Sequence, residues 1–421
     1  MQNKLLKPRI PSFENKFLGF IEKHIMVIAV FLISAAAIAI RALLFDHLSA
    51  DAYNFLIPWY DTLAEKGFAG LSEPVGNYNI LYQTIIALFT YLPIKALHTY
   101  KLFSCVFDFL TAGLVAYVIY KSFSKRPRLK ALIAYAAVLM SPLVFLNSAC
   151  WAQCDVIYTF FCIFSVYHIY QEKYVSSLIL FGVALTFKLQ AIFILPFLLF
   201  VYLYKKRFSI LYFLIIPAVM VVLSLPGLFM GRGFKEIFTI YLKQTSEYKS
   251  MAMNYPSFWL LFKTEGLDSF YKEFSTVAIL LTFAVLLVLI IAWLKKKVAF
   301  TLENVLIMAF LISYTCVLFL PSMHERYGFI YEILGLMLAF WFVKTIPLLV
   351  LMYFSSIASY SNYLFRLSTN STVLCAINTL VYVAYVVYLS RQMFKEKEKE
   401  KEKEKEKEKE KAAPALSKRK A

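Results

Sequence analysis

Residues 25–61 read IMVIAVFLISAAAIAIRALLFDHLSADAYNFLIPWYD. Residues 25–44 are apolar except for Ser34 and Arg41, and a helix needs about 20 such residues to cross a membrane. The segment LSADAYNFLIPWYD follows directly, at residues 48–61, with Asp51 near its start. This order predicts a membrane span that ends at a polar segment, and the same pattern recurs along the chain.

The composition indicates a polytopic membrane protein. Of the 421 residues, 61% are hydrophobic, whereas a soluble domain is about half apolar. Apolar runs recur from residue 24 to residue 389 and are continuous rather than alternating, which favours helices over strands. The first run is long enough to be a span, so we expect no cleavable signal peptide. The predicted fold class is an all-α polytopic membrane protein.

The formal net charge of +18 does not indicate nucleic-acid binding, because the basic residues form short clusters between apolar runs, as cytoplasmic loops do. This pattern predicts about twelve transmembrane helices with both chain ends in the cytoplasm. The predicted spans are residues 25–44, 100–120, 131–148, 156–171, 174–187, 191–204, 208–227, 275–294, 303–320, 328–343, 346–362 and 372–389. The pair within 174–204 is short, and broken helices are the alternative there.

The first extracytoplasmic loop is predicted to be long, covering residues 45–99. Within it, residues 80–92 are apolar but too short to cross, so we expect an interfacial or re-entrant helix. If this segment were a crossing, every later loop would be inverted and the basic clusters would repeatedly face outward.

Three parts of the chain are expected: a cytoplasmic N-terminal segment (1–23), a transmembrane catalytic domain (24–394) and a C-terminal tail (395–421). Residues 395–411 alternate Lys and Glu, which offers no apolar residue for a core, so a disordered cytoplasmic tail is predicted. The six cysteines lie in or beside apolar runs without metal-ligand spacing, and we interpret them as small apolar residues.

Unusual polar residues collect at the predicted outer ends of the spans. Ionisable groups at membrane depth are costly and usually functional, whereas residues that merely cap helices would be spread over both faces. The clustering therefore predicts one functional site. The residues are Asp51, Gln153, Asp155, Lys188, Gln190, His324, Glu325 and Arg326.

Four motifs in this set resemble the GT-C superfamily of polytopic glycosyltransferases, in the order found there. They are Ser-Ala-Asp51-Ala-Tyr, Trp151-Ala-Gln153-Cys-Asp155, Phe187-Lys188-Leu-Gln190 and His324-Glu325-Arg326-Tyr327. The chain is most similar to the dolichyl-phosphate-glucose-dependent glucosyltransferases of asparagine-linked glycosylation and to bacterial hexosyltransferases that use polyprenyl-phosphate sugars. The resemblance covers roughly residues 25–345. Two departures are Asn77-Tyr78-Asn79, where Tyr-Pro-Pro is common, and Ala152, where Gly is usual.

The resemblance implies a GT-C-like bundle that transfers a hexose from a polyprenyl-phosphate donor to an outer-face glycan, lipid-linked or cell-wall acceptor, with inversion. A lipid phosphate is already a good leaving group, so only the acceptor hydroxyl needs a base, and Asp51 suits that role. The alternative is that Asp51 caps the following helix.

The other residues have expected roles in binding. Arg326, Lys188 and His324 would bind the donor phosphate. The alternative for Arg326 and Lys188 is that they snorkel toward water at a span end. The alternative for His324 is a polar residue at the helix mouth whose hydrogen bonds are satisfied within the protein. The sugar or acceptor would be contacted by Gln153, Asp155, Gln190 and Trp59. Glu325 belongs to the same group of residues and would orient Arg326. Capping is the alternative for Gln153 and Asp155. For Trp59 and Trp151 an aromatic belt at the membrane interface is the favoured alternative.

No metal and no other cofactor are expected, and the expected partners are the donor, the acceptor and membrane lipid. The long polar loop 228–274 is a candidate for covering the site or binding the acceptor. A transporter or flippase of lipid-linked saccharides is the rival function, but such proteins usually carry repeated halves and polar groups near the midplane. A scaffold that docks through its tail would leave the outer residues unexplained. We therefore expect an integral membrane enzyme with an extracytoplasmic active site.

Overall fold

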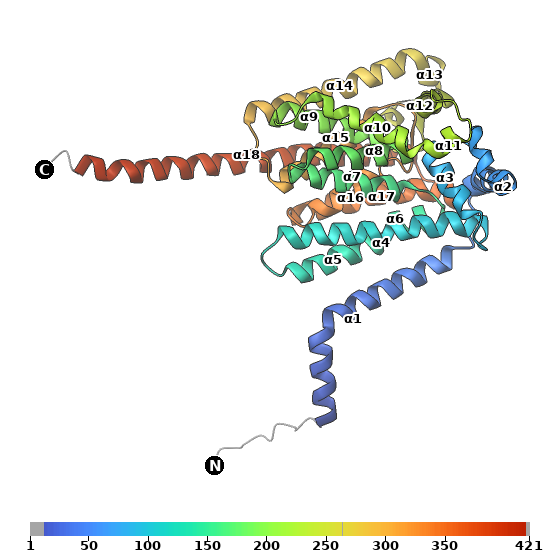
Figure 1. Ribbon diagram of the computed structural model, residues 1–421. Coiled ribbons are helices and arrows are strands. Elements are labelled where there is room, and N and C mark those ends of the chain that lie inside the picture. The colour runs from blue at the N-terminus through green and yellow to red at the C-terminus, as the bar shows by residue number, and fades with distance from the viewer. Residues whose placement is uncertain (1–11, 263, 418–421) are drawn as a thin grey trace.

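The computed structural model describes residues 12–262 and 264–417, which form a helical bundle (Figure 1). The α-helices are α1 (Ser12–Leu44), α2 (Ile57–Lys66), α3 (Ile80–Phe89), α4 (Ala96–Ser122), α5 (Pro127–Leu139), α6 (Pro142–Phe145), α7 (Asp155–Tyr170), α8 (Tyr174–Phe187), α9 (Leu195–Lys205), α10 (Ile215–Leu223), α11 (Leu225–Phe229), α12 (Glu236–Glu247), α13 (Thr264–Ser269), α14 (Tyr271–Lys296), α15 (Leu302–Phe319), α16 (Phe329–Leu338), α17 (Ile346–Leu364) and α18 (Ser371–Ser417).

Shorter elements join these helices. The π-helices are η1 (Ala52–Leu56) and η3 (Leu146–Cys150), and the 3-10 helices are η2 (Gly67–Ser72), η4 (Leu189–Ile194), η5 (Ile210–Leu214), η6 (Phe258–Leu261) and η7 (Val343–Thr345). Two-residue strands β1 (Ala252–Met253) and β2 (Met323–His324) pair in parallel.

Helices of spanning length confirm the membrane-protein prediction, but not the number of crossings. Among the described residues, six helical segments have the length and apolar composition to cross: Phe13–Leu44, Ala96–Ser122, Tyr271–Lys296, Leu302–Phe319, Val343–Leu364 and Ser371–Phe394. The bent pair Pro127–Leu139 and Pro142–Cys150 could be a seventh. The other predicted spans contain helices of 10 to 17 residues, so the figure of twelve stays a prediction.

One predicted straight span, 131–148, is broken in the structure. Helix α5 ends at Leu139, and the chain resumes after a bend of 43°. Pro142 explains the break, because proline has no N–H to donate into the preceding turn and disfavours helical backbone at the residue before it. Proline also stands in the first turn of α2, α5, α9 and α17, where its missing N–H costs nothing.

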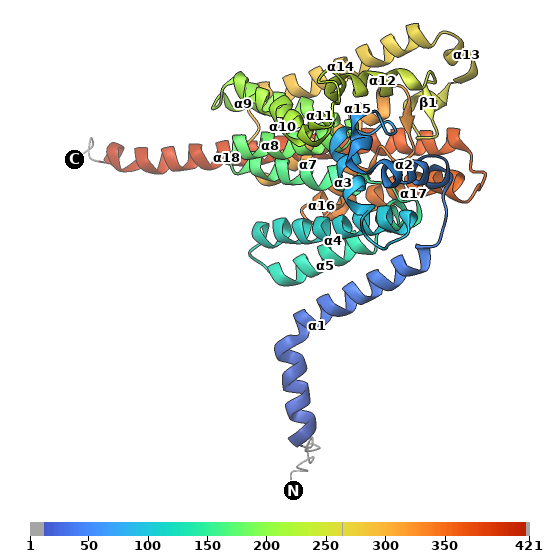
Figure 2. The ribbon, with the colours of Figure 1, turned by 45° about the vertical axis from the view of Figure 1, so that its right-hand side comes forward.

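The helices differ in how deeply they are buried. In α15, 94% of the spanning window is buried, whereas the fractions are 28% for α14 and 11% for α1. Helix α15 is therefore the centre of the bundle, and α1 and α14 expose apolar surface of the kind that faces lipid. Figures 1 and 2 both show the N-terminal half of α1 pointing away from the other helices.

Side-chain contacts identify the two ends of the bundle. At one end, Phe123 after α4 packs on Trp341 after α16, with ring centroids 5.0 Å apart. At the same end Glu172 pairs with Lys205 at 2.6 Å. The opposite end, on the right in Figure 1, carries α2, α3, α11, α12 and α13.

The C-terminal tail differs from its prediction, and the cysteines agree with theirs. Helix α18 continues through the Lys/Glu run to Ser417, where a disordered tail is predicted; Lys and Glu are good helix formers, and this alternation places opposite charges three residues apart. All six cysteines are buried and unpaired, as predicted.

Candidate active site

Asp51 lies just after α1, at the start of η1. Its Oδ2 accepts hydrogen bonds from Trp151 Nε1 at 2.9 Å and from Gln153 Nε2 at 2.8 Å. Its Oδ1 accepts a short hydrogen bond from the Tyr363 hydroxyl. The Asp51 side chain makes no capping bond to the following helix, so the capping alternative does not describe this structure. The carboxylate is held from two distant parts of the chain and keeps 17% of its surface exposed.

The π-helix η3 and the turn after it present Trp151 and Gln153 to Asp51. Ala152 lies in the left-handed region, with φ of 66°, which is where a glycine is favoured because it has no Cβ. This explains why glycine would be usual at this position. Such π-turns occur frequently at functional sites.

Trp151 corrects one prediction. Its side chain is fully buried, so it is not part of an aromatic belt at the membrane interface. The indole stacks on the Tyr363 ring with centroids 4.7 Å apart, and the Arg326 guanidinium lies 5.3 Å from its ring centroid. Trp151 therefore connects the carboxylate to the cation of the site.

Arg326 lies between three carboxylates. Its Nη1 is 3.8 Å from Asp51 Oδ2 and 3.5 Å from Glu325 Oε1, and its Nε is 3.8 Å from Asp155 Oδ2. The 3.8 Å separations exceed hydrogen-bond length, and Nε has no hydrogen-bond partner among the described residues. The guanidinium is thus attracted by its neighbours and still has donors for another acceptor.

Asp155 and Lys188 form a buried pair. Lys188 Nζ donates to Asp155 Oδ1 at 2.6 Å, and Asn147 Nδ2 donates to Oδ2 at 2.9 Å. Lys188 is 4% exposed and Asp155 is 0% exposed. Lys188 therefore does not snorkel to water, and Asp155 has no free surface for a sugar hydroxyl. In place of the predicted sugar contact, Asp155 holds the two cations of the site, because a buried charge must be paired.

The segment 322–327 is attached to the long loop predicted to cover the site. Strand β2 pairs with β1, and Ser322 Oγ donates to the carbonyl of Ser250 at 2.8 Å. The His324 ring packs against Tyr248 with centroids 5.0 Å apart. Burial, together with Arg326 and Lys188, lowers the pKa of His324 to about 3. At neutral pH His324 is therefore an uncharged hydrogen-bonding group rather than a cation.

Glu325 is nearly completely buried beside Arg326. Burial raises its pKa to about 7, although Arg326 acts in the opposite direction. Its Oε2 has no hydrogen-bond partner among the described residues. Glu325 thus lies next to the guanidinium, and its orienting role stays a prediction.

A second layer of buried charges fixes the elements that carry the site. Arg41 Nε donates to Asp108 Oδ2 at 2.8 Å, and Ser148 Oγ donates to the same oxygen at 2.6 Å. Lys101 Nζ donates to the carbonyls of Leu44, Phe45 and His47 at 2.7 to 2.9 Å. These bonds satisfy carbonyls at the end of α1, which would otherwise have no intrahelical partner.

The structure thus brings together most of the predicted site residues. Asp51, Gln153, Asp155, Lys188, Glu325 and Arg326 form one connected cluster, with His324 beside it. Gln190 is buried in η4 and makes no side-chain hydrogen bond to this cluster within the described chain, where its Oε1 has no partner. Trp59 packs on Tyr78, 5.7 Å away, and that ring lies 5.9 Å from Lys188 Nζ.

Three contributors were not predicted. Tyr363 comes from α17, Asn147 from η3 and Tyr78 from the loop before α3. Tyrosines and asparagines beside apolar runs are common, so only their contacts distinguish these three.

A comparison with known protein families matches residues 78–321, more than half of the chain, to glycosyltransferase family 87. The chain belongs to this family. No curated protein matches it. This family 87 protein is therefore a glycosyltransferase, and its apolar helices make it an integral membrane protein. The matched range includes Gln153, Asp155 and Lys188 but neither Asp51 nor Arg326. Only the structure places Asp51 and Arg326 beside residues of the matched range.

Proposed function

We propose that this family 87 enzyme transfers a hexose from a polyprenyl phosphate to a hydroxyl of an outer-face acceptor, with inversion and with Asp51 as the general base. The observation that carries the proposal is the 3.8 Å separation of the Asp51 carboxylate from the Arg326 guanidinium. A base and a phosphate-binding cation in one place are what a direct displacement on a sugar phosphate requires.

The reaction needs one proton acceptor and one leaving group. The acceptor oxygen attacks the anomeric carbon and its proton passes to Asp51, while the bond from that carbon to the phosphate oxygen breaks. The electron pair leaves on the polyprenyl phosphate. A carboxylate has about four lone-pair sites, and Trp151, Gln153 and Tyr363 occupy three of them. One site remains for the acceptor hydroxyl.

The cations in the same cluster as Asp51 suit the departing phosphate. Arg326 has donors in a planar fork, which matches phosphate oxygens, and Lys188 adds a point charge. Asp155 fixes both cations before the donor arrives. Groups that are already in place stabilise developing charge without reorganising during the reaction.

The distribution of charge supports an extracytoplasmic site. The loop between α4 and α5 at the far end carries Lys125 and Arg126, and Arg128 follows in the first turn of α5. At the same end, Lys295 and Lys296 lie in the last turn of α14 and Lys297 follows it. Clusters of this kind favour the cytoplasmic side. The site lies at the other end of the same helices.

The test uses purified enzyme, synthetic polyprenyl-phosphate hexoses and a panel of glycan acceptors. Asp51→Asn keeps the size of the side chain and an oxygen acceptor but removes the base, so kcat should fall by about 10²- to 10⁴-fold with donor affinity nearly unchanged. Asp46→Asn is the matched control, because Asp46 is exposed at the same end and pairs with His98. If Asp51→Asn transfers sugar at the wild-type rate, Asp51 is not the base.

A further inference from the structure

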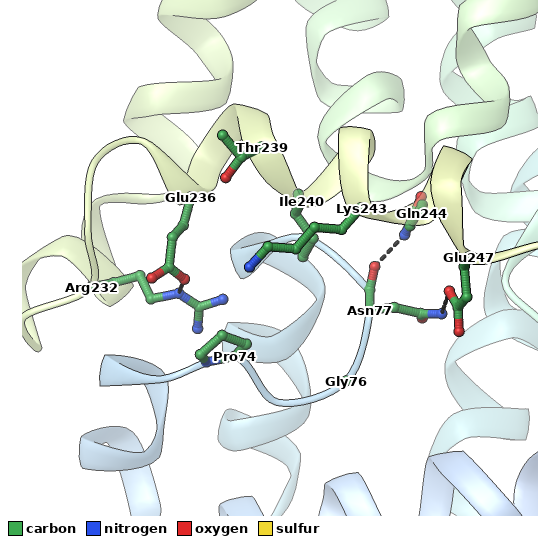
Figure 3. A pocket seen from close by; sticks show the side chains of 10 residues that line it. All are labelled: Pro74, Gly76, Asn77, Arg232, Glu236, Thr239, Ile240, Lys243, Gln244 and Glu247. Atoms are coloured by element: carbon green, nitrogen blue, oxygen red, sulfur yellow. Dashed lines mark hydrogen bonds and ion pairs between the residues drawn. The ribbon is translucent and has the colours of Figure 1, made fainter.

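A cavity lies between the 74–77 loop and α12 (Figure 3). Its volume is about 270 Å³. It is lined by Pro74, Gly76, Asn77, Arg232, Glu236, Thr239, Ile240, Lys243, Gln244 and Glu247. Figure 3 shows the Lys243 side chain extending from α12 toward the loop. None of these residues takes part in the transfer chemistry proposed above.

The cavity has fixed walls. Arg232 is buried, pairs with Glu236 and donates to the carbonyl of Glu73. On the far side, Gln244 Nε2 donates to the Asn77 carbonyl, and Asn77 Nδ2 donates to Glu247 Oε2 at 3.3 Å. These bonds hold the loop at a distance from α12, so the space between them is part of the fold.

Gly76 fixes the shape of the loop. Its φ is 71°, and the ring of Trp59 covers it so closely that a Cβ would lie 2.3 Å from the indole. Only glycine fits a left-handed position in such contact. Trp59, predicted to bind sugar or acceptor, thus supports the wall of this cavity.

The lining combines apolar surface with polar groups, which suits an uncharged ligand that has both hydroxyl groups and apolar ring faces, as a saccharide has. Its charged residues are two cations, Arg232 and Lys243, and two carboxylates, Glu236 and Glu247, so the formal charges balance. Thr239, Asn77 and Gln244 add neutral donors and acceptors, and Pro74 and Ile240 add apolar surface. Sugar hydroxyls both donate and accept hydrogen bonds, while a phosphate would need an excess of donors and positive charge.

Both walls continue directly into the site. Asn77 precedes Tyr78, whose ring lies 5.9 Å from Lys188 Nζ. Glu247 precedes Tyr248, whose ring packs on His324. A saccharide that fills the cavity would therefore be next to the residues around Asp51 and Arg326.

We propose that this cavity binds the sugar residues of the acceptor that adjoin the one receiving the new hexose. The inference rests on the proposed function, since it assumes that the hydroxyl being glycosylated belongs to a saccharide. It assigns α12 and the 74–77 loop to the recognition of acceptor length rather than to chemistry.

The test compares two acceptors, an octyl monohexoside and an octyl trihexoside of the same sugar. Thr239→Trp fills the cavity from α12 and should raise the KM for the trihexoside about tenfold while leaving the KM for the monohexoside and the KM for the donor within twofold. Lys243→Met should weaken trihexoside binding in the same direction. Thr245→Trp is the matched control, because Thr245 is exposed on α12 and does not line the cavity.

Titration calorimetry of trihexoside binding gives a second readout that does not depend on turnover. Loss of binding in Thr239→Trp but not in Thr245→Trp would support the acceptor subsite, whether or not any tested donor is used. If the enzyme uses none of the tested polyprenyl-phosphate hexoses, that result counts against the proposed donor and not against the subsite. Equal effects on both acceptors, or wild-type binding by Thr239→Trp, would overturn the subsite.

Discussion

His324 has surroundings that set its charge and thereby its contribution to the site. The charges of Arg326 and Lys188 both act on it, and the Tyr248 and Tyr327 rings pack on it with centroids 5.0 and 5.1 Å away. Two cations and burial disfavour a third positive charge. His324 can therefore donate or accept a hydrogen bond at neutral pH, while the positive charge at the site comes from Arg326 and Lys188.

The lowered pKa of His324 makes a pH-dependent prediction. Between about pH 6.5 and 3 the unfolded chain binds a proton that the folded protein excludes, so stability should fall as the pH drops through this window. The His324→Gln variant has no side chain that binds this proton. Its free energy of unfolding, relative to that of the wild type, should therefore rise by up to about 2 kcal/mol between pH 8 and pH 5.

The measurement is the thermal midpoint of both proteins in detergent at several pH values. Glu325, whose raised pKa works in the opposite direction, is present in both proteins and cancels in the comparison. A difference between the two midpoints that is constant with pH would show that folding does not shift the pKa of His324, which would contradict the prediction.

At the level of elements, Asp51 and its partners are placed by contacts among α1, α4 and η3. Arg41 on α1 pairs with Asp108 on α4, and Ser148 of η3 donates to the same carboxylate. Ser49 Oγ, two residues before Asp51, donates to the carbonyl of Trp151 at 3.0 Å. The position of Asp51 thus depends on buried polar contacts among three elements.

Removing one member of the Arg41–Asp108 pair should be more harmful than removing both. Arg41→Met leaves a buried carboxylate without its cation, and such a change costs about 3–5 kcal/mol. The double variant Arg41→Met/Asp108→Leu leaves no buried charge and should recover much of that loss. Thermal midpoints and kcat for the two single variants and the double variant give the coupling energy; additive losses would contradict a direct pair.

At the level of the whole molecule, the two ends of the bundle have different chemistry. The site end carries carboxylates, amides and aromatic rings, and the opposite end carries the basic clusters. Helix α18 leaves the bundle at the basic end, and its Lys/Glu extension runs away from the site in both views (Figures 1 and 2). The orientation of the enzyme in the membrane therefore decides which compartment supplies the acceptor.

Cysteine labelling in intact cells tests this orientation. The native cysteines are all buried, so background labelling should be low. A membrane-impermeant maleimide should react with Thr245→Cys at the site end and should not react with Ser124→Cys, which is exposed between α4 and α5, until the cells are permeabilised. The opposite pattern would place the site in the cytoplasm.

Continuous apolar runs and basic clusters were enough to predict a helical membrane protein, because hydrophobic length and charge are properties of the sequence itself. The same reasoning found Asp51, Lys188 and Arg326, because ionisable residues stand out beside apolar runs. It could not find Tyr363, whose hydroxyl reaches Asp51 from a helix more than 300 positions away.

The sequence by itself determined the class of protein, the location of its apolar helices and which polar residues are unusual. Tertiary structure alone decided which of them meet. Asp155 became an internal partner for two cations, Trp151 a buried donor to Asp51, and the 74–77 loop a wall of a cavity. The physical reason is that hydrophobicity is read along the chain, whereas the pairing of buried charges depends on distances set by how the helices pack.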